Sequence, residues 1–367
     1  MISSVLILIL GFGLPFGYFY FKKNPQFGGK ITSSEKRRLR ASKNWKGGKF
    51  LNLQKTTMEL KISGIPGLIK ESSRAKKTQN PKSNLKILPF IKKDFQKDGV
   101  PKFVWYGHSV LLLQIHNRNL LIDPMFGPDA SPVGPIRTKR FSRSSLEIID
   151  MLPDLDAILL THDHYDHLDF QSIRKLKQKV GRFLVPLGVS RHLENWGIDK
   201  NSIQEFDWWD NAGIFDLELT FTPSRHFSGR GLADRAKSLW GGWVIKNQEF
   251  AVYWSGDGGY GDHFKEIGEK LGPFDWGFME CGQYNHRWHQ IHMYPEEAVQ
   301  AALDSRVQKA IPVHWGGFSL ALHHWKDPIE RFVKAASQNK IEFYTPQIGA
   351  IVNGNETTYE PWWEALD

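Results

Sequence analysis

Residues 161–169 read Thr-His-Asp-His-Tyr-Asp-His-Leu-Asp, and this stretch decides which fold and which site the chain can have. It follows the apolar run 156–160, which predicts a strand, and opens the segment 169–180, whose apolar spacing predicts a helix. His162 and His164 are two residues apart, so their side chains point the same way in extended backbone. Three imidazoles and a carboxylate within six residues are costly to desolvate without a shared partner. The stretch therefore indicates a metal site, since neutral imidazole and carboxylate are natural zinc ligands.

Three more candidate ligands occur downstream, each after an apolar run that predicts a strand. They are His226, Asp257 and His314, and each lies in sequence rich in glycine or serine, which lets the backbone approach closely. The chain has one cysteine, Cys281, which excludes an intramolecular disulfide framework and a zinc site built mainly from thiolates. Any metal must therefore be held by some of the 14 histidines and by carboxylates.

From residue 103 onward, predicted strands alternate with predicted helices, which favours an α/β or α+β fold with two packed sheets. We expect strands at 103–106, 110–115, 119–122, 156–160, 182–185, 217–222, 243–245, 250–254, 276–279, 309–313 and 350–353. We expect helices at 169–180, 188–196, 264–271, 295–305 and 328–337. The helix at 295–305 has proline at its first position and glutamates in its first turn, where the helix dipole favours them.

The order His-x-His-x-Asp-His, then histidine, aspartate and histidine, resembles the metallo-β-lactamase superfamily. Within it, the chain more closely resembles the N-acylphosphatidylethanolamine-hydrolysing phospholipase D family. The stretches that carry this resemblance are Tyr106-Gly-His-Ser-Val, Leu121-Ile-Asp-Pro, 160–169, Phe206-Asp-Trp-Trp, Phe221-Thr-Pro-Ser, Gly256-Asp-Gly-Gly-Tyr, Pro295-Glu-Glu-Ala and Val313-His-Trp-Gly-Gly-Phe. The resemblance implies the metallo-β-lactamase fold, an αβ/βα sandwich with two metals at the strand ends.

The resemblance also implies which residues hold the metals. One metal would be held by His162, His164 and His226, the other by Asp166, His167 and His314, with Asp257 bridging the two. Asp123 matches a carboxylate that does not bind metal itself, and orienting a ligand imidazole is the physical role for such a group. We expect two divalent ions, with Zn²⁺ the first choice, although iron or manganese also suit these ligands.

Two such ions about 3.5–4 Å apart can share one water and lower its pKa toward about 7. The resulting hydroxide would attack phosphorus or a carbonyl carbon, so no serine or cysteine nucleophile is needed. We expect Asp257, Asp166 and His292 to be the catalytic residues, with His292 donating to the phosphate or the leaving oxygen. Gly258 stands where relatives commonly have threonine, which removes a hydroxyl next to the bridging carboxylate.

Residues 2–21 are uncharged and mostly apolar, about the length needed to cross a ~30 Å hydrocarbon layer as a helix. Aromatic residues at 18–21 and then Lys22 and Lys23 follow the pattern of a membrane interface. We therefore expect residues 1–21 to be a single-pass anchor, with the catalytic domain on the cytoplasmic side. A cleaved signal peptide with export, and a buried or interfacial helix, are the alternatives.

The net charge of +9 is unevenly distributed. Residues 22–102 carry 22 basic and five acidic side chains, whereas 103–367 carry 26 basic and 34 acidic ones. This basic arm is a solvated linker, a cover that packs on the body, or a polybasic segment that binds anionic lipid head groups. In the last case each base near the membrane would contribute ~1 kcal/mol to binding. Nucleic acid is the weaker candidate partner, because the body itself is acidic.

Together these features predict three parts: an anchor at 1–21, a basic arm at 22–102 and a hydrolase domain at 103–367. The leading hypothesis is a membrane-associated phosphodiesterase of phospholipase D type that cleaves N-acyl phosphatidylethanolamine or a similar phospholipid. The expected partners are therefore a phospholipid substrate and a membrane surface, and the oligomeric state stays open. The alternatives are a lactonase or ester hydrolase on the same metals, a metal-dependent nuclease, and a metal-binding scaffold without turnover.

Overall fold

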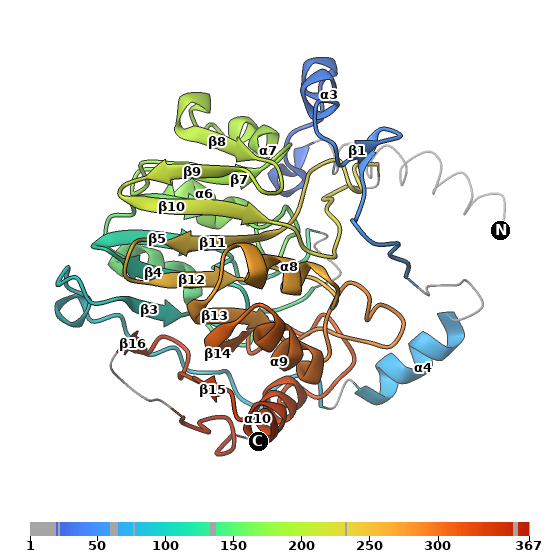
Figure 1. Cartoon of the computed structure of the whole chain (residues 1–367). Coiled ribbons are helices and arrows are strands. Elements are labelled where there is room, and N and C mark those ends of the chain that lie inside the picture. The colour runs from blue at the N-terminus through green and yellow to red at the C-terminus, as the bar shows by residue number, and fades with distance from the viewer. Residues whose placement is uncertain are drawn as a thin grey trace.

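The computed structural model describes residues 20, 23–58, 65–75, 78–132, 137–231, 233–354 and 359–366. Two seven-stranded sheets lie face to face, and helices cover their outer faces (Figure 1). The αβ/βα sandwich expected from the sequence is therefore confirmed.

The first sheet combines an antiparallel meander with parallel strands. Tight turns join β3, β4 and β5 in antiparallel order, whereas β5, β6, β7 and β8 run parallel to one another. The strands, in spatial order, are β16 (Ile351–Asn353), β3 (Lys102–Trp105), β4 (Leu111–Ile115), β5 (Arg118–Ile122), β6 (Ala157–Leu159), β7 (Phe183–Pro186) and β8 (Ile203–Phe206).

The second sheet has the same mixed character. Its strands β9 to β12 are antiparallel, and β12 to β15 are parallel. In spatial order they are β15 (Glu342–Phe343), β14 (Val307–Val313), β13 (Phe274–Glu280), β12 (Ala251–Trp254), β11 (Gly242–Lys246), β10 (Leu217–Thr222) and β9 (Asn211–Ile214). The sequence prediction missed β8, β9 and the two-residue strand β15.

Helices on the outer faces belong to the parallel crossovers. They are α5 (Ile148–Met151), α6 (Phe170–Leu176) and α7 (Ser190–Asn195) on the first sheet, and α8 (His263–Lys270), α9 (Pro295–Asp304) and α10 (Asp327–Asn339) on the second. Helix α9 begins as expected, with Pro295 in its first turn and Glu297 accepting a hydrogen bond from the Tyr294 N–H. Helix α6 ends earlier than expected, because the chain turns back to pair Val180 with Leu155.

Strand β3 shows why the sandwich forms. Phe103 and Trp105 pack into the core between the two sheets, whereas Val104 and Tyr106 pack into the layer between the first sheet and its helices. Both faces of the strand are therefore buried, as is usual for sheets covered on both sides. The same alternation continues along β4, β5 and β6.

The described part of the basic arm packs on the body as a cover. Leu39, Trp45, Phe50 and Leu85 are buried in the core cluster between the sheets, and the Phe50 N–H donates to the Ala236 carbonyl. Arm elements that the sequence did not predict are the helices α3 (Ser33–Leu39) and α4 (Ile65–Ala75) and the strands β1 (Trp45–Lys46) and β2 (Lys49–Phe50). The four short 3-10 helices of the described chain are η2 (Pro25–Phe27), η4 (Lys92–Asp94), η5 (Ser145–Glu147) and η6 (Lys200–Ser202).

The expected membrane anchor at 1–21 lies outside the described residues, apart from Tyr20. Within the part of the chain that is described, every helix is too short or too polar to span a bilayer. The proposed boundary between arm and hydrolase domain, at residues 102 and 103, stays a prediction.

Candidate metal centre

The predicted ligands meet at one edge of the sandwich because each follows the carboxyl end of a strand. His162 to His167 follow β6, His226 follows β10, Asp257 follows β12 and His314 follows β14. Strands from both sheets thus deliver side chains to the same edge, which is the usual place for sites in parallel sheets.

A first group of donors consists of three imidazoles. The His164 Nδ1 lies 2.8 Å from the His162 Nε2 and 3.2 Å from the His226 Nε2. Zinc–nitrogen bonds of about 2.0–2.1 Å in a tetrahedral site place neighbouring ligand atoms roughly 3.3 Å apart. The spacing of these three donors fits ligands around one ion.

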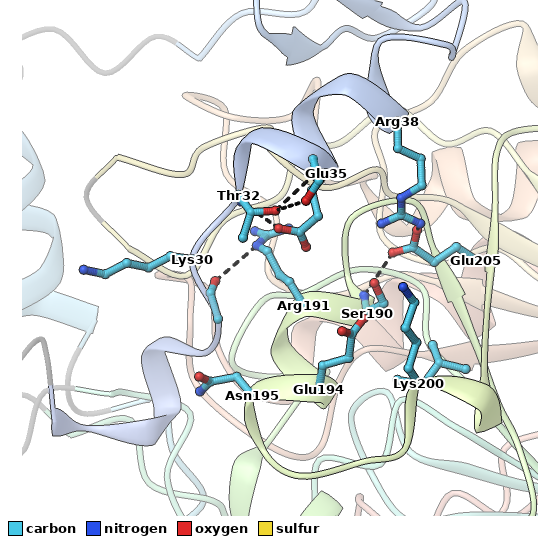
Figure 2. A pocket seen from close by; sticks show the side chains of 13 residues that line it. Lys30, Thr32, Glu35, Arg38, Ser190, Arg191, Glu194, Asn195, Lys200 and Glu205 are labelled. Carbon is cyan, nitrogen blue, oxygen red and sulfur yellow. Dashed lines mark hydrogen bonds and ion pairs between the residues drawn. The ribbon is translucent and has the colours of Figure 1, made fainter.

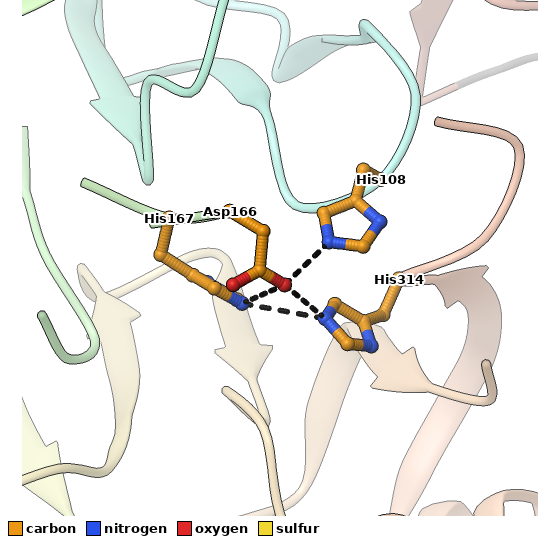
Figure 3. Close-up of side chains that lie close together, drawn as sticks. All are labelled: His108, Asp166, His167 and His314. Carbon is orange, nitrogen blue, oxygen red and sulfur yellow. Dashed lines mark hydrogen bonds and ion pairs between the residues drawn. The ribbon is translucent and has the colours of Figure 1, made fainter. Parts of the chain in front are cut away.

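A second group consists of Asp166, His167 and His314, which Figure 3 shows converging together with His108. The His314 Nε2 lies 3.3 Å from both the Asp166 Oδ2 and the His167 Nε2. The Asp166 Oδ2 is also 3.5 Å from the His167 Nε2. These separations again fit donors around one ion.

Asp257 lies between the two groups. Its Oδ2 is 3.1 Å from the His167 Nε2 and 3.0 Å from the His314 Nε2. The same oxygen is 3.9 Å from the Nε2 atoms of both His162 and His226. One carboxylate oxygen therefore faces both groups, as a bridging ligand must.

Burial prepares the first group for a cation. It lowers the pKa of His164 to about 4 and holds the pKa values of His162 and His226 well below the usual value, aided by neighbouring imidazoles. These rings are therefore neutral near pH 7 and can donate lone pairs. Metal ligation requires this form of histidine.

In the second group, neighbouring carboxylates set the direction of the histidine pKa shifts. Burial opposes the protonation of His167 and His314, but Asp257 and its neighbouring carboxylates raise both pKa values well above the usual value. Burial likewise opposes ionisation of Asp257, yet His167 and His314 keep its pKa well below the usual range. Protonated His167 and His314 thus offset the negative charge of the nearby carboxylates, a role that a bound cation would take over.

Asp123 lies directly behind this group, as the resemblance implies. Its Oδ2 is 2.8 Å from the His167 Nδ1 and accepts a 2.6 Å hydrogen bond from the Thr161 hydroxyl. Its Oδ1 accepts from the Thr161 N–H at 2.8 Å. Because the Nδ1 of His167 is engaged here, its Nε2 is left to face Asp257 and His314.

His108 and Glu280 also belong to the cluster, although the sequence analysis gave neither a role. The His108 Nε2 lies 2.8 Å from the Asp166 Oδ2, and burial lowers the pKa of this ring to about 3. Glu280 ends β13 and contacts the Nδ1 atoms of His292 and His314. Its position after an apolar strand, like that of the ligands, is the signal that could have revealed it.

His108 and His314 both have left-handed backbone, with φ of 57° and 66°. Their segments hold each other in place, since the His314 N–H donates to the His108 carbonyl at 2.9 Å and the His108 N–H donates to the Trp315 carbonyl at 2.8 Å. Such conformations are unusual for residues other than glycine and concentrate at functional sites.

His292 lines a cavity of about 270 Å³ beside the metal-site residues. The cavity wall includes His164, Asp166, Asp257 and His314, and its apolar part is made by Met58, Phe227, Trp288, Ile291 and Leu320. Neither lysine nor arginine is among the described residues that line it. Two further histidines of this part of the chain bond elsewhere: His323 accepts from the Gln283 N–H, and His324 accepts from the Lys326 N–H.

The arm also supports the site through Asn52. Its side-chain amide donates to the His226 carbonyl at 2.8 Å and accepts from the His226 N–H at 3.1 Å. The His226 Nδ1 is 2.9 Å from the Ile291 carbonyl, which leaves Nε2 directed at the cluster. Asn52 could not be recognised from sequence, because 174 residues separate it from His226.

A cavity of about 610 Å³ lies elsewhere, between the arm and α7 (Figure 2). Arg38 and Glu205 pair across it, and the Arg191 side chain donates to the Gly29 carbonyl at 3.2 Å. Because none of the candidate metal ligands lines it, this cavity is not part of the site.

Comparison with known proteins agrees with this geometry. The family model described as "Beta-lactamase superfamily domain" matches residues 118–315. The chain belongs to the metallo-β-lactamase superfamily. The protein is therefore an enzyme, a metal-dependent hydrolase. Its candidate metal-binding residues lie at the edge of the sandwich.

Two relatives match most of the chain. An uncharacterized protein of Mycobacterium tuberculosis is 39% identical over 71% of this chain and 70% of its own length. The N-acyl-phosphatidylethanolamine-hydrolyzing phospholipase D 1 of Caenorhabditis elegans is 30% identical over 83% of this chain and 89% of its own length. Among solved structures, the metallo hydrolase Igni18 of Ignicoccus hospitalis superposes with a TM-score of 0.54 at 20% identity, covering 69% of this chain and 98% of its own, which supports the fold.

Proposed function

We propose that the protein is a dinuclear metal-dependent phosphodiesterase of phospholipase D type, acting on N-acyl phosphatidylethanolamine or a similar phospholipid. The observation that carries the proposal is the position of Asp257, whose Oδ2 faces both groups of donors at 3.0–3.9 Å. A single-metal site would not need one carboxylate oxygen between two complete sets of ligands.

When bound, two divalent cations would lower the pKa of a shared water and stabilise the charge that develops on phosphate. Asp257 is then placed to accept a hydrogen bond from the attacking water. Asp166, with His167 and His314, fixes the second set of donors. His292 lines the same cavity, with its ring stacked 5.4 Å from that of His314, and there it can donate to the leaving oxygen.

The apolar lining of the cavity supports a lipid substrate. Phe227, Trp288 and Leu320 offer surface for hydrocarbon next to the predicted metals. The absence of basic side chains among the described lining residues argues against RNA, whose phosphates need them. The similarity to the phospholipase D of Caenorhabditis elegans points to the same substrate class.

We also propose that the enzyme works at a membrane surface. Exposed bases on and after α3 could contact anionic head groups, namely Lys36, Arg37, Arg40, Lys43 and Lys46. The test is co-sedimentation with phosphatidylglycerol vesicles, which should weaken as salt is added. Equal sedimentation with purely zwitterionic vesicles at all salt concentrations would contradict an electrostatic contact.

The function is tested by metal analysis together with a turnover panel. The purified protein should contain two divalent ions per chain and hydrolyse N-acyl phosphatidylethanolamine to phosphatidic acid and N-acylethanolamine. The panel also contains a simple phosphodiester, a lactone and RNA. Consumption of the lactone or RNA alone would refute the lipid proposal.

The Asp257→Ala variant should lose both the second ion and nearly all turnover. Asp150→Ala is the matched control, because Asp150 lies on α5 with its side chain 63% exposed. Full turnover by Asp257→Ala would rule out the two-metal mechanism, whichever substrate is used.

A further inference from the structure

Glu280 is a buried acid for which the proposed reaction has so far no use. It ends β13 and is only 1% exposed. Its Oε2 accepts a 2.8 Å hydrogen bond from the Gly258 N–H. The ion pairs of the described residues give it no lysine or arginine, only His292 and His314. A buried carboxylate is costly unless it is hydrogen-bonded and its charge is balanced, so the Gly258 N–H and these two imidazoles must offset the cost.

Gly258 explains how the backbone reaches Glu280. A Cβ at this position would lie 3.0 Å from the Arg225 backbone nitrogen and 3.3 Å from the Ser224 Cβ, so these neighbours would have to move by a few tenths of an ångström to make room for it. The glycine therefore lets the chain after Asp257 pack tightly and direct its N–H at the Glu280 carboxylate. The departure from threonine thus coincides with a hydrogen bond that anchors Glu280.

The other oxygen of Glu280 faces two imidazoles. The Oε1 contacts the His292 Nδ1 in a short hydrogen bond and lies 3.5 Å from the His314 Nδ1. The two rings stack nearly parallel, with their centroids 5.4 Å apart at an angle of 10°. Because Nδ1 of His292 is engaged by Glu280, Nε2 is the nitrogen left for the cavity.

We propose that Glu280 is a positioning residue that holds the imidazole of His292, so that its Nε2 protonates the leaving oxygen of the phosphodiester. This inference rests on the proposed function. In the step, the oxygen of water forms a bond to phosphorus and the bond from phosphorus to the leaving oxygen breaks. The Nε2 proton of His292 moves to that oxygen, while Nδ1 stays bonded to Glu280. One proton of the water then returns to His292 through solvent, and the other remains with the phosphate product.

The test uses the full metal-loaded enzyme and two phosphatidyl esters that differ only in the leaving group. One ester releases the alkoxide of an N-acylethanolamine and the other releases 4-nitrophenolate. Only the alkoxide needs a proton in order to leave. Glu280→Gln, which keeps the size of the side chain and the acceptor for Gly258, should lower kcat on the alkyl ester about 100- to 1,000-fold. On the nitrophenyl ester, kcat should fall less than about fivefold, and KM should be unchanged for both.

His292→Ala should show the same selective loss, and the double variant should be no slower than His292→Ala alone, because the two residues act as a unit. Glu296→Gln, an exposed acid on α9, is the control and should behave as the wild type. Metal content is measured for every variant, and hydrolysis of the nitrophenyl ester shows that each has folded. Glu280→Asp provides a second variant should the glutamine prove unstable, and it should lose the alkyl ester selectively as well.

Equal losses on both esters, or loss of metal from Glu280→Gln, would overturn the inference by making Glu280 a ligand or a structural residue. Additive losses in the double variant would also overturn it. Each of these outcomes is a ratio of the kcat or metal content of a variant to that of the wild type. Failure of the wild type to hydrolyse either ester would instead refute the proposed function, and the role of Glu280 with it.

Discussion

Asp123 is placed to orient a candidate metal ligand, His167, from behind the two donor groups. It binds both the backbone and the hydroxyl of Thr161 and orients His167. We expect Asp123→Asn to weaken metal affinity about 10- to 100-fold, because the amide can no longer hold the ring with the same charge. Competition with a chelator measures this, with Asp150→Asn as control, and unchanged affinity would contradict the orienting role.

The candidate ligands could be predicted because they occur in a dense pattern. His162, His164, Asp166 and His167 share six residues of sequence, and that density alone indicates a cation. His108 and Glu280 do not belong to such a dense pattern, since each stands alone and contacts a partner 58 or 12 positions away. Contacts formed only by folding are not visible in local spacing.

At the scale of elements, the arm segment that follows β2 supports His226 from outside the hydrolase body. Asn52→Ala would remove both hydrogen bonds to the His226 backbone. We expect the free energy of unfolding to fall by about 1–3 kcal/mol, and the metal content at limiting zinc to fall as well. Leu53→Ala, at a side chain that is 56% exposed, is the control. Wild-type metal content in Asn52→Ala would show that the arm does not position this ligand.

Helix α8 begins with a buried histidine that makes stability depend on pH. Burial, aided by the charge of Arg225, lowers the pKa of His263 to about 3, whereas the unfolded chain titrates near 6.5. The folded protein therefore binds no proton here between these values, so stability is full above pH 6.5 and is lost as the pH falls toward 3.

When the pH is lowered from 7 to 5, the free energy of unfolding of the wild type should fall by about 2 kcal/mol more than that of His263→Phe. Urea unfolding at both pH values measures the difference. The exposed His286→Asn variant controls for the general removal of an imidazole. Identical pH dependence of His263→Phe and wild type would contradict a buried, neutral ring.

Element types were predicted better than element ends. Apolar runs such as those of β4 and of residues 310–313 in β14 identified their strands, because side chains on both faces of these segments are buried. β8 and β9 were missed because their side chains are mostly half-buried or exposed, so their sequence has no continuous apolar run. The pairing of these two edge strands comes from the neighbouring strands of each sheet.

At the scale of the molecule, the two sheets are joined by large aromatic side chains. Trp243 on β11 is fully buried, packs against Phe206 of the first sheet and donates to the Leu160 carbonyl at 2.9 Å. We expect Trp243→Ala to lower the free energy of unfolding by about 3–5 kcal/mol, because a large cavity would remain between the sheets. Tyr359→Ala, at a half-exposed ring, should have little effect in the same denaturation experiment.

Each donor group combines side chains from both sheets. His162 and His164 follow a strand of the first sheet and His226 a strand of the second, and His314 of the second sheet joins Asp166 of the first. Because neither group is complete until the two sheets have docked, we expect ions to bind at the end of folding. Added zinc should therefore leave the refolding rate unchanged while slowing unfolding, which stopped-flow fluorescence can measure. The ion would then extend the lifetime of the assembled enzyme and play no part in guiding the chain toward it.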